Sequence, residues 1–208
     1  MSEIKNLLLD LGGVVLDVDY HKMVETFKSY NIPDFDKHYT QKDQVEIIDL
    51  FEEGKCTIDE FRNGIRDLVG VNLSDKQIDD AWFSMIIGLP PERIQLLGML
   101  KLKYNIYLFS NTNELHIEML KVKYKEDFGF DIFQALFTKA YFSNEIKMRK
   151  PHPESFQWLI DDAGIKADET LFIEDTLHHI EGAKKVGLNT YWLTGGETII
   201  DLYDKKII

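Results

Sequence analysis

The stretch Ile4-Lys5-Asn6-Leu7-Leu8-Leu9-Asp10-Leu11-Gly12-Gly13 decides the fold of this chain. Its apolar run, Leu7 to Leu9, is short, stops at an acid and is soon followed by two glycines. A continuous apolar run of this length is typical of a strand that is buried on both faces, as in a parallel sheet. We therefore predict a first strand over residues 4–10, with Asp10 at its carboxyl end.

After Pro90-Pro91 the sequence alternates between helical and extended patterns. The predicted strands cover residues 106–110, 135–139, 170–173 and 190–193. The predicted helices cover residues 92–103 and the segments around Leu115, Met119 and Val122, around Phe156, Leu159 and Ile160, and around Ile180 and Ala183. Strands that alternate with helices imply right-handed crossovers and a parallel sheet covered on both faces. The predicted fold class is α/β, with a doubly wound, three-layer, Rossmann-like core.

Residues between about 19 and 87 follow a different pattern, with apolar residues at helical spacing, such as Met23, Phe27 and Tyr30. Two capping boxes predict helix starts, and three glycines predict helix ends. The boxes are Thr57 with Glu60 and Ser74 with Gln77; the glycines are Gly54, Gly70 and Gly88. No segment here is a convincing strand. We therefore predict a small all-helical cap over residues 18–90, inserted into a core of residues 1–17 and 91–208.

Composition limits the classes of function. The 208 residues are 44% hydrophobic and 29% charged, which is typical of a globular protein, and the net charge of −12 argues against binding to a nucleic-acid backbone. No apolar run approaches the roughly 20 residues that span a bilayer, and the first residues do not form a signal peptide. We expect a cytoplasmic protein without a membrane or nucleic-acid partner. Cys56 is the only cysteine, so an intramolecular disulfide and a thiolate cluster are excluded.

Polar side chains follow the ends of several predicted strands: Asp10, Ser110, Lys150 and the pair Glu174-Asp175. Ligands of such sheets bind outside the carboxyl ends of the strands. Each residue alone also has a simpler interpretation. Asp10 or Asp175 would cap a helix or form a turn, Ser110 would belong to a capped turn, and Lys150 would be a solvated loop residue.

Together these residues supply the parts of one reaction. Phosphoryl transfer needs a nucleophile, a divalent cation and donors that hold the phosphoryl oxygens. Asp10 is a candidate nucleophile, and Glu174 and Asp175 offer the hard oxygens that Mg²⁺ prefers. Ser110, with the N–H groups that follow it, and Lys150 are candidate phosphate donors.

The wording and order of four motifs resemble the haloacid dehalogenase (HAD) superfamily over essentially the whole chain. The motifs are Asp10-Leu11-Gly12-Gly13-Val14, Leu108-Phe109-Ser110-Asn111-Thr112-Asn113, Arg149-Lys150-Pro151-His152-Pro153 and Phe172-Ile173-Glu174-Asp175. His179 stands where the family usually has asparagine. The helical insertion resembles the small cap of the family. Phe51-Glu52-Glu53-Gly54-Lys55 and Pro90-Pro91-Glu92 are typical of its sugar-phosphate phosphatase-like branch.

This resemblance implies a Mg²⁺-dependent phosphatase that acts on a small phosphorylated metabolite through an aspartyl-phosphate intermediate. It implies that Asp10 and Lys150 are catalytic and that Ser110, Asn111 and Lys150 bind phosphate. It also implies that Asp10, Glu174, Asp175 and the carbonyl of Gly12 hold the metal ion. The substrate and the oligomeric state stay open.

Gly12 departs from the family pattern, because most phosphatases of the superfamily carry an acid–base aspartate two residues after the nucleophile. Without that acid, we expect a preference for less basic leaving groups, as in sugar 1-phosphates. Asp17, Asp19 and His21 are nearby in the sequence but lack the family spacing. A member that has lost turnover and serves as a binding or regulatory protein is therefore the main alternative.

Two further classes fit less well. A haloalkanoate dehalogenase lacks the second aspartate but needs no metal, which would leave the Glu174-Asp175 pair without a purpose. A receiver domain has its acidic pair early in the chain and its lysine last, which is the reverse of the order found here.

Overall fold

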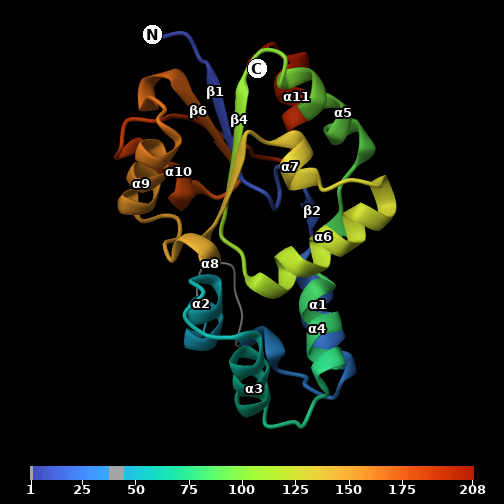
Figure 1. Cartoon of the computed structure of the whole chain (residues 1–208). Helices are drawn as coiled ribbons and strands as arrows, with labels where there is room; N and C mark the ends of the chain where they lie inside the picture. Colours follow the sequence, from blue (N-terminus) through green and yellow to red (C-terminus); the bar gives the residue numbers. More distant parts are fainter. Residues whose placement is uncertain (1, 38–44) are drawn as a thin grey trace.

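The computed structural model describes residues 2–37 and 45–208, and at its centre is a parallel sheet of five strands (Figure 1). The strand order is β5-β4-β1-β6-β7. The strands are β1 (Asn6–Leu9), β4 (Asn105–Ser110), β5 (Lys139–Phe142), β6 (Thr170–Glu174) and β7 (Asn189–Trp192). Leu9 of β1 is in register with Leu108 of β4 and Ile173 of β6. The carboxyl ends of these three strands therefore meet at one edge of the sheet.

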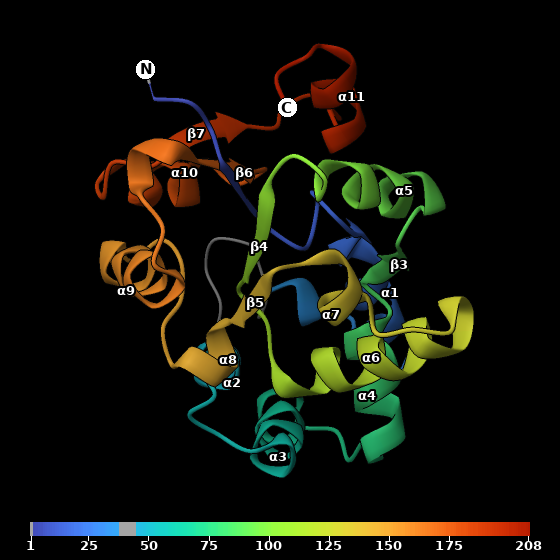
Figure 2. The same cartoon turned by 45° about the horizontal axis from the view of Figure 1, so that its top comes forward.

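Helices cover both faces of this sheet (Figure 2). Leu7 and Leu9 pack in one apolar cluster, which includes residues of α5 (Pro91–Leu100), α6 (Glu114–Phe128), α7 (Ile132–Leu136) and α11 (Ile199–Asp204). Leu8 points to the opposite face and packs with α9 (Pro153–Ala163) and α10 (Leu177–Lys184). Successive side chains of a strand point to opposite faces, so the three leucines let β1 be buried on both sides. The predicted three-layer α/β core is confirmed.

The helical insertion lies beyond the carboxyl edge of the sheet (Figure 1). It contains α1 (Tyr20–Ser29), a short turn of helix (Phe35–Lys37), α2 (Glu46–Glu52), α3 (Ile58–Val69) and α4 (Asp75–Phe83). These elements share their own apolar cluster, which includes Phe27, Phe61 and Trp82 and which Leu115 of α6 joins. On these separate clusters we propose the division of the chain into a core, residues 1–17 and 91–208, and a cap, residues 18–90.

Local signals place the cap helices well. Both predicted capping boxes form, at the starts of α3 and α4, and Gly70 ends α3 in the left-handed conformation. The prediction that Gly88 ends a helix is wrong, because α4 ends at Phe83 and Gly88 closes the strand β3 (Ile86–Gly88). This strand pairs antiparallel with β2 (Asp17–Val18) where the cap joins the core. Strands of two or three residues show no periodicity, so the sequence did not predict them.

One core strand is shifted from its predicted place. The sequence predicts a strand over residues 135–139, but Ala135 lies in the helix α7 and β5 begins only at Lys139. The side chain of Asp131 accepts hydrogen bonds from the backbone N–H groups of Phe133 and Gln134, and this cap starts the helix. A helix of five residues is too short to show the helical period, so its apolar residues resembled a strand. In the described part of the chain, no helix has the length and apolarity that crossing a bilayer requires.

Candidate active site

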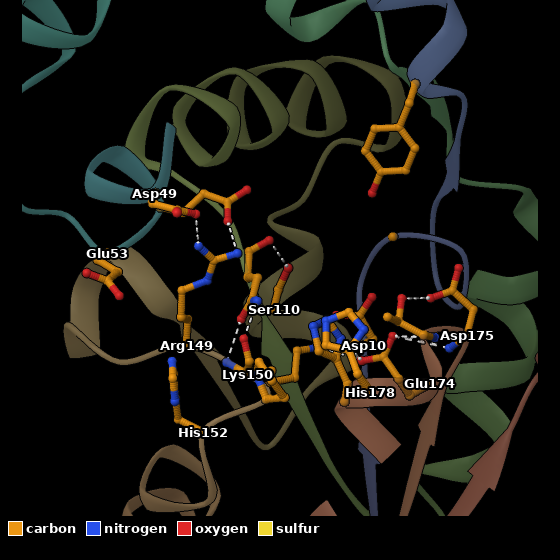
Figure 3. A pocket seen from close by; sticks show the side chains of 17 residues that line it. Asp10, Asp49, Glu53, Ser110, Arg149, Lys150, His152, Glu174, Asp175 and His178 are labelled. Carbon is orange, nitrogen blue, oxygen red and sulfur yellow. Dashed lines mark hydrogen bonds and ion pairs between the residues drawn. The ribbon is translucent and has the colours of Figure 1, made fainter. Parts of the chain in front are cut away.

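A cavity of about 410 Å³ opens at the carboxyl edge of the sheet, between core and cap residues (Figure 3). All the site residues predicted from the sequence line it: Asp10, Gly12, Ser110, Asn111, Lys150, Glu174 and Asp175. They come from the ends of β1, β4 and β6 and from the loop before α9. The parallel register explains this gathering, because it brings the three strand ends together.

Lys150 is the central cation of the site. It is fully buried, and its Nζ lies 2.5 Å from Oδ1 of Asp10 and 2.6 Å from Oε2 of Glu174. Burial works to lower the pKa of Lys150, but the two carboxylates outweigh it and raise that pKa. The side chain therefore stays protonated and offers a positive charge beside Asp10.

The three acids of the site share a small volume. Asp10, Glu174 and Asp175 each offer an oxygen within 4.8 Å of the others. Burial, together with the neighbouring carboxylates, raises the pKa of Asp10 to about 8, against the effect of Lys150. Burial and Glu174 likewise raise the pKa of Asp175 to about 7. A divalent cation would remove this repulsion, and carboxylate oxygens suit Mg²⁺, so the residues fit the predicted ion.

Glu174 differs from the other two acids in its hydrogen bonds. Its Oε2 accepts from Lys150 and from Nδ1 of His179, 3.0 Å away, and its Oε1 accepts from the backbone N–H groups of Asp175 and Thr176. Burial works to raise the pKa of Glu174, but Lys150 and His179 outweigh it and hold that pKa below its ordinary value. Both oxygens of Glu174 are therefore already engaged with protein donors.

The two glycines after Asp10 have different roles. Gly13 has φ of +74°, and a Cβ at this position would overlap Oδ2 of Asp175. Gly12 is under no such constraint, because a Cβ there would lie 3.3 Å from Cγ1 of Val18. Position 13 therefore requires glycine, so that Asp175 can approach Asp10. Position 12 has room for a side chain if Val18 moves by a few tenths of an ångström.

Ser110 and Asn111 follow β4 and line the cavity. The side chain of Asn111 donates to the backbone carbonyl of Lys150 and accepts from its N–H, both at 2.9 Å. In this structure the Asn111 side chain therefore positions the backbone of Lys150, and the phosphate contacts of Ser110 and Asn111 stay predictions.

His179 was noted in the sequence only as a departure from the family pattern. Burial lowers the pKa of His179 to about 4, so the ring is neutral and Nδ1–H donates to Glu174. Asp17 and Asp19 lie outside the cavity lining, since Asp17 pairs with Arg93 at 2.7 Å and Asp19 caps α1. His21 does not line the cavity either.

Further residues that line the cavity were not among the site residues predicted from the sequence. They are Tyr20, Asp49, Glu52, Glu53, Arg149, His152 and His178. Arg149 and His152 belong to the third motif, and Glu52 and Glu53 to a stretch typical of one branch of the family, so these four carried a signal. Tyr20 and Asp49 carried none, because only the packing of the cap shows which side of a cap element meets the core. His178, at the start of the core helix α10, carried none either.

The sequence profile described as haloacid dehalogenase-like hydrolase matches residues 4–187, which include the ends of β1, β4 and β6 that form the site. The chain belongs to the haloacid dehalogenase-like hydrolase family. The resemblance drawn from the four motifs, and the prediction of a hydrolase, are thereby confirmed.

Individual members of the HAD-like family are also similar. A D-ribitol-5-phosphate phosphatase of Bacteroides thetaiotaomicron is 31% identical over 90% of this chain and 91% of its own length. An aspartate-to-alanine variant of a HAD family enzyme of the same organism, solved with magnesium and inorganic phosphate, has a TM-score of 0.91 and 38% identity over 96% of this chain and 98% of that one. A HAD-like hydrolase of Porphyromonas gingivalis has a TM-score of 0.88 and 26% identity over 99% of this chain and 98% of that one. The predictions of a phosphatase and of Mg²⁺ agree with these HAD relatives.

Proposed function

We propose that this chain is a Mg²⁺-dependent phosphatase of small phosphorylated sugars or sugar alcohols, with Asp10 as its nucleophile. One observation carries the proposal: Asp10 lies against the buried Lys150 and beside two further carboxylates at the carboxyl edge of the sheet. An acid, a cation and a site for a divalent ion are the set that phosphoryl transfer requires. The relative that hydrolyses D-ribitol 5-phosphate supports the same reaction.

Each residue has a part in this reaction. Asp10 attacks phosphorus in line with the ester oxygen, which leaves as an alkoxide and takes a proton from water. A second water then hydrolyses the aspartyl phosphate and releases inorganic phosphate. Lys150 stabilises the phosphoryl oxygens and favours the ionised form of Asp10, whose charge a bound Mg²⁺ would stabilise further, and Ser110 donates to the same oxygens. We assign Asp10, Asp175, Glu174 and the carbonyl of Gly12 to Mg²⁺, which would neutralise the charge of the phosphoryl group when bound.

The class of leaving group is the finer part of the proposal. Gly12 lacks a proton to donate and favours leaving groups of low basicity, such as the anomeric oxygen of a sugar 1-phosphate. The substrate of the Bacteroides relative, D-ribitol 5-phosphate, has a primary alcohol as its leaving group. Both kinds of ester therefore belong in the test.

The test is release of phosphate from D-ribitol 5-phosphate, glucose 1-phosphate and p-nitrophenyl phosphate, with Mg²⁺ and with EDTA. We expect Mg²⁺-dependent release that Asp10→Asn lowers more than about 100-fold, the equivalent of about 2.7 kcal/mol in the barrier. Circular dichroism of the variant checks that the fold survives. If phosphate is released from none of the three esters, the proposal is refuted and a binding or regulatory protein is supported.

A further inference from the structure

We propose that the outer wall of this cavity selects phosphate esters whose leaving group is uncharged and rejects esters that carry a second anion. The outer wall is formed by Asp49, Glu52, Glu53 and Arg149, which all line the cavity. The inference rests on the proposed phosphatase function, which would place the leaving group in the same cavity as this wall when Asp10 takes the phosphoryl group.

Arg149 is the cation nearest in sequence to the catalytic Lys150. Its guanidinium is paired with carboxylates of the cap. Its Nη1 bonds to Oδ1 of Asp49, and its Nη2 lies 3.0 Å from Oε2 of Glu52 (Figure 3). The side chain is only 18% exposed. A guanidinium held by two carboxylates has little charge left to attract a third anion.

The cap acids are fixed in this position. The hydroxyl of Ser143, which is fully buried, donates to the backbone carbonyl of Glu52 at 2.6 Å, and the backbone N–H of Thr112 donates to the same hydroxyl. This pair of bonds connects the end of α2 to the loop after β4. The acids of α2 therefore face the cavity because of a defined contact with the core.

In the described part of the cavity wall, no lysine or arginine is left for a second anion. Among the described lining residues, the lysine and arginine side chains are Lys150 and Arg149, and carboxylates hold both. Glu53 pairs at 2.5 Å with Lys55, which does not line the cavity. A Mg²⁺ ion held by Asp10, Glu174 and Asp175 would lie at the phosphate-binding end of the cavity. Its charge would offset these carboxylates and the phosphate.

A sugar alcohol meets this wall favourably, since its hydroxyl groups donate hydrogen bonds to carboxylate oxygens. A carboxylate or second phosphate in the same place would face Asp49, Glu52 and Glu53 without a free donor cation. Juxtaposed like charges in a partly buried site disfavour binding strongly enough to determine specificity.

The direct test compares ribitol 5-phosphate with ribonate 5-phosphate, which differ only in a CH₂OH or carboxylate at C1. We expect kcat/KM of the wild-type enzyme to be about 100-fold or more higher for ribitol 5-phosphate. Values within about threefold of each other would overturn the inference.

A variant tests the cause of the selection. Asp49→Asn with Glu52→Gln releases Arg149, so the preference for ribitol 5-phosphate should fall by about tenfold or more. Glu25→Gln with Asp67→Asn is the matched control, because it removes the same charge from exposed positions of α1 and α3 outside the cavity. An unchanged preference in the first variant would overturn the inference. If that variant does not fold, Asp49→Asn alone is measured. This single change removes one of the two carboxylates that hold Arg149.

Binding separates this inference from the proposed function. If the wild type releases phosphate from no ester, the proposed function fails, and the two esters are then titrated calorimetrically into the wild-type protein with Mg²⁺. Tight binding of ribitol 5-phosphate with about 100-fold weaker binding of ribonate 5-phosphate supports the selective wall. Equal affinity, or binding of neither ester, refutes it.

Discussion

The backbone of Gly13 lies against the carboxylate of Asp175, so closely that a Cβ at Gly13 would overlap Oδ2. Gly13 also has φ of +74°, a conformation that costs an alanine about 1 kcal/mol or more. The first and the fourth motifs of the family are therefore fitted to each other at this contact.

Gly13→Ala should push Asp175 away from Asp10 and lower Mg²⁺ affinity and kcat by about 10- to 100-fold, as changes around metal ligands commonly do. Activity as a function of Mg²⁺ concentration measures both quantities. Gly12→Ala is the control, because its Cβ meets only Val18, at 3.3 Å. Equal activity of the two variants would contradict the importance of this contact.

The acids of the site should differ in their response to Mg²⁺. Both oxygens of Glu174 accept protein hydrogen bonds, whereas Oδ1 of Asp175 accepts one, from the hydroxyl of Thr176. Asp175→Asn should therefore raise the Mg²⁺ concentration needed for half-maximal activity more than Glu174→Gln does. Glu174→Gln should mainly lower kcat, because it disturbs Lys150. The reverse order would assign Glu174 as the stronger ligand.

Much of this site followed from the sequence, and the reason is local. Asp10 and Glu174 end apolar runs, and the end of a buried parallel strand has only one place in such a sheet. The contacts of Arg149 with Asp49 and Glu52 join residues about 100 positions apart, and no sequence period reports such a pair. The shift of β5 shows the same limit, since the cap formed by Asp131 outweighed the apolar run that follows it.

His116 is another residue whose place only the packing reveals. It lies near the start of α6, its Nε2 is 3.0 Å from the backbone carbonyl of Trp82 in α4, and its ring stacks on the Trp82 ring. Burial lowers the pKa of His116 to about 4, so the neutral ring bridges core and cap.

The low pKa of His116 makes the stability of the fold depend on pH. The unfolded chain binds this proton near pH 6.5 and the folded one only near pH 4, so the contribution of His116 is complete above pH 6.5 and is lost as pH falls towards 4. The loss should approach about 3 kcal/mol in the free energy of unfolding. Urea unfolding measures the free energy of unfolding at pH 7.5 and at pH 5. The decrease between these two pH values should be smaller for His116→Gln than for the wild type. His21→Gln, at an exposed position, should match the wild type, and equal decreases in all three proteins would contradict the assignment.

The consequence of Gly12 for the leaving group is open to a matched comparison. An alkoxide needs a proton as the ester bond breaks, and a positioned acid typically contributes 10²- to 10⁴-fold, or about 3 to 5 kcal/mol. The acids that follow Gly12 in the sequence, Asp17 and Asp19, do not replace this acid. Asp17 pairs with Arg93, and Asp19 caps α1. An aryl oxide leaves without that help, so p-nitrophenyl phosphate reports the rest of the site.

Gly12→Asp should therefore raise kcat for ribitol 5-phosphate more than for p-nitrophenyl phosphate, by about tenfold or more in the ratio of the two rates. Gly12→Asn is the matched control, because it has the same shape and the same contact with Val18 but is a far weaker acid. Val18→Ala provides space for both side chains if the 3.3 Å approach lowers their activity. The hypothesis is wrong if aspartate and asparagine give the same ratio, or if the wild type already hydrolyses ribitol 5-phosphate as fast as the aryl ester, since Gly12 would then not limit departure of the alcohol.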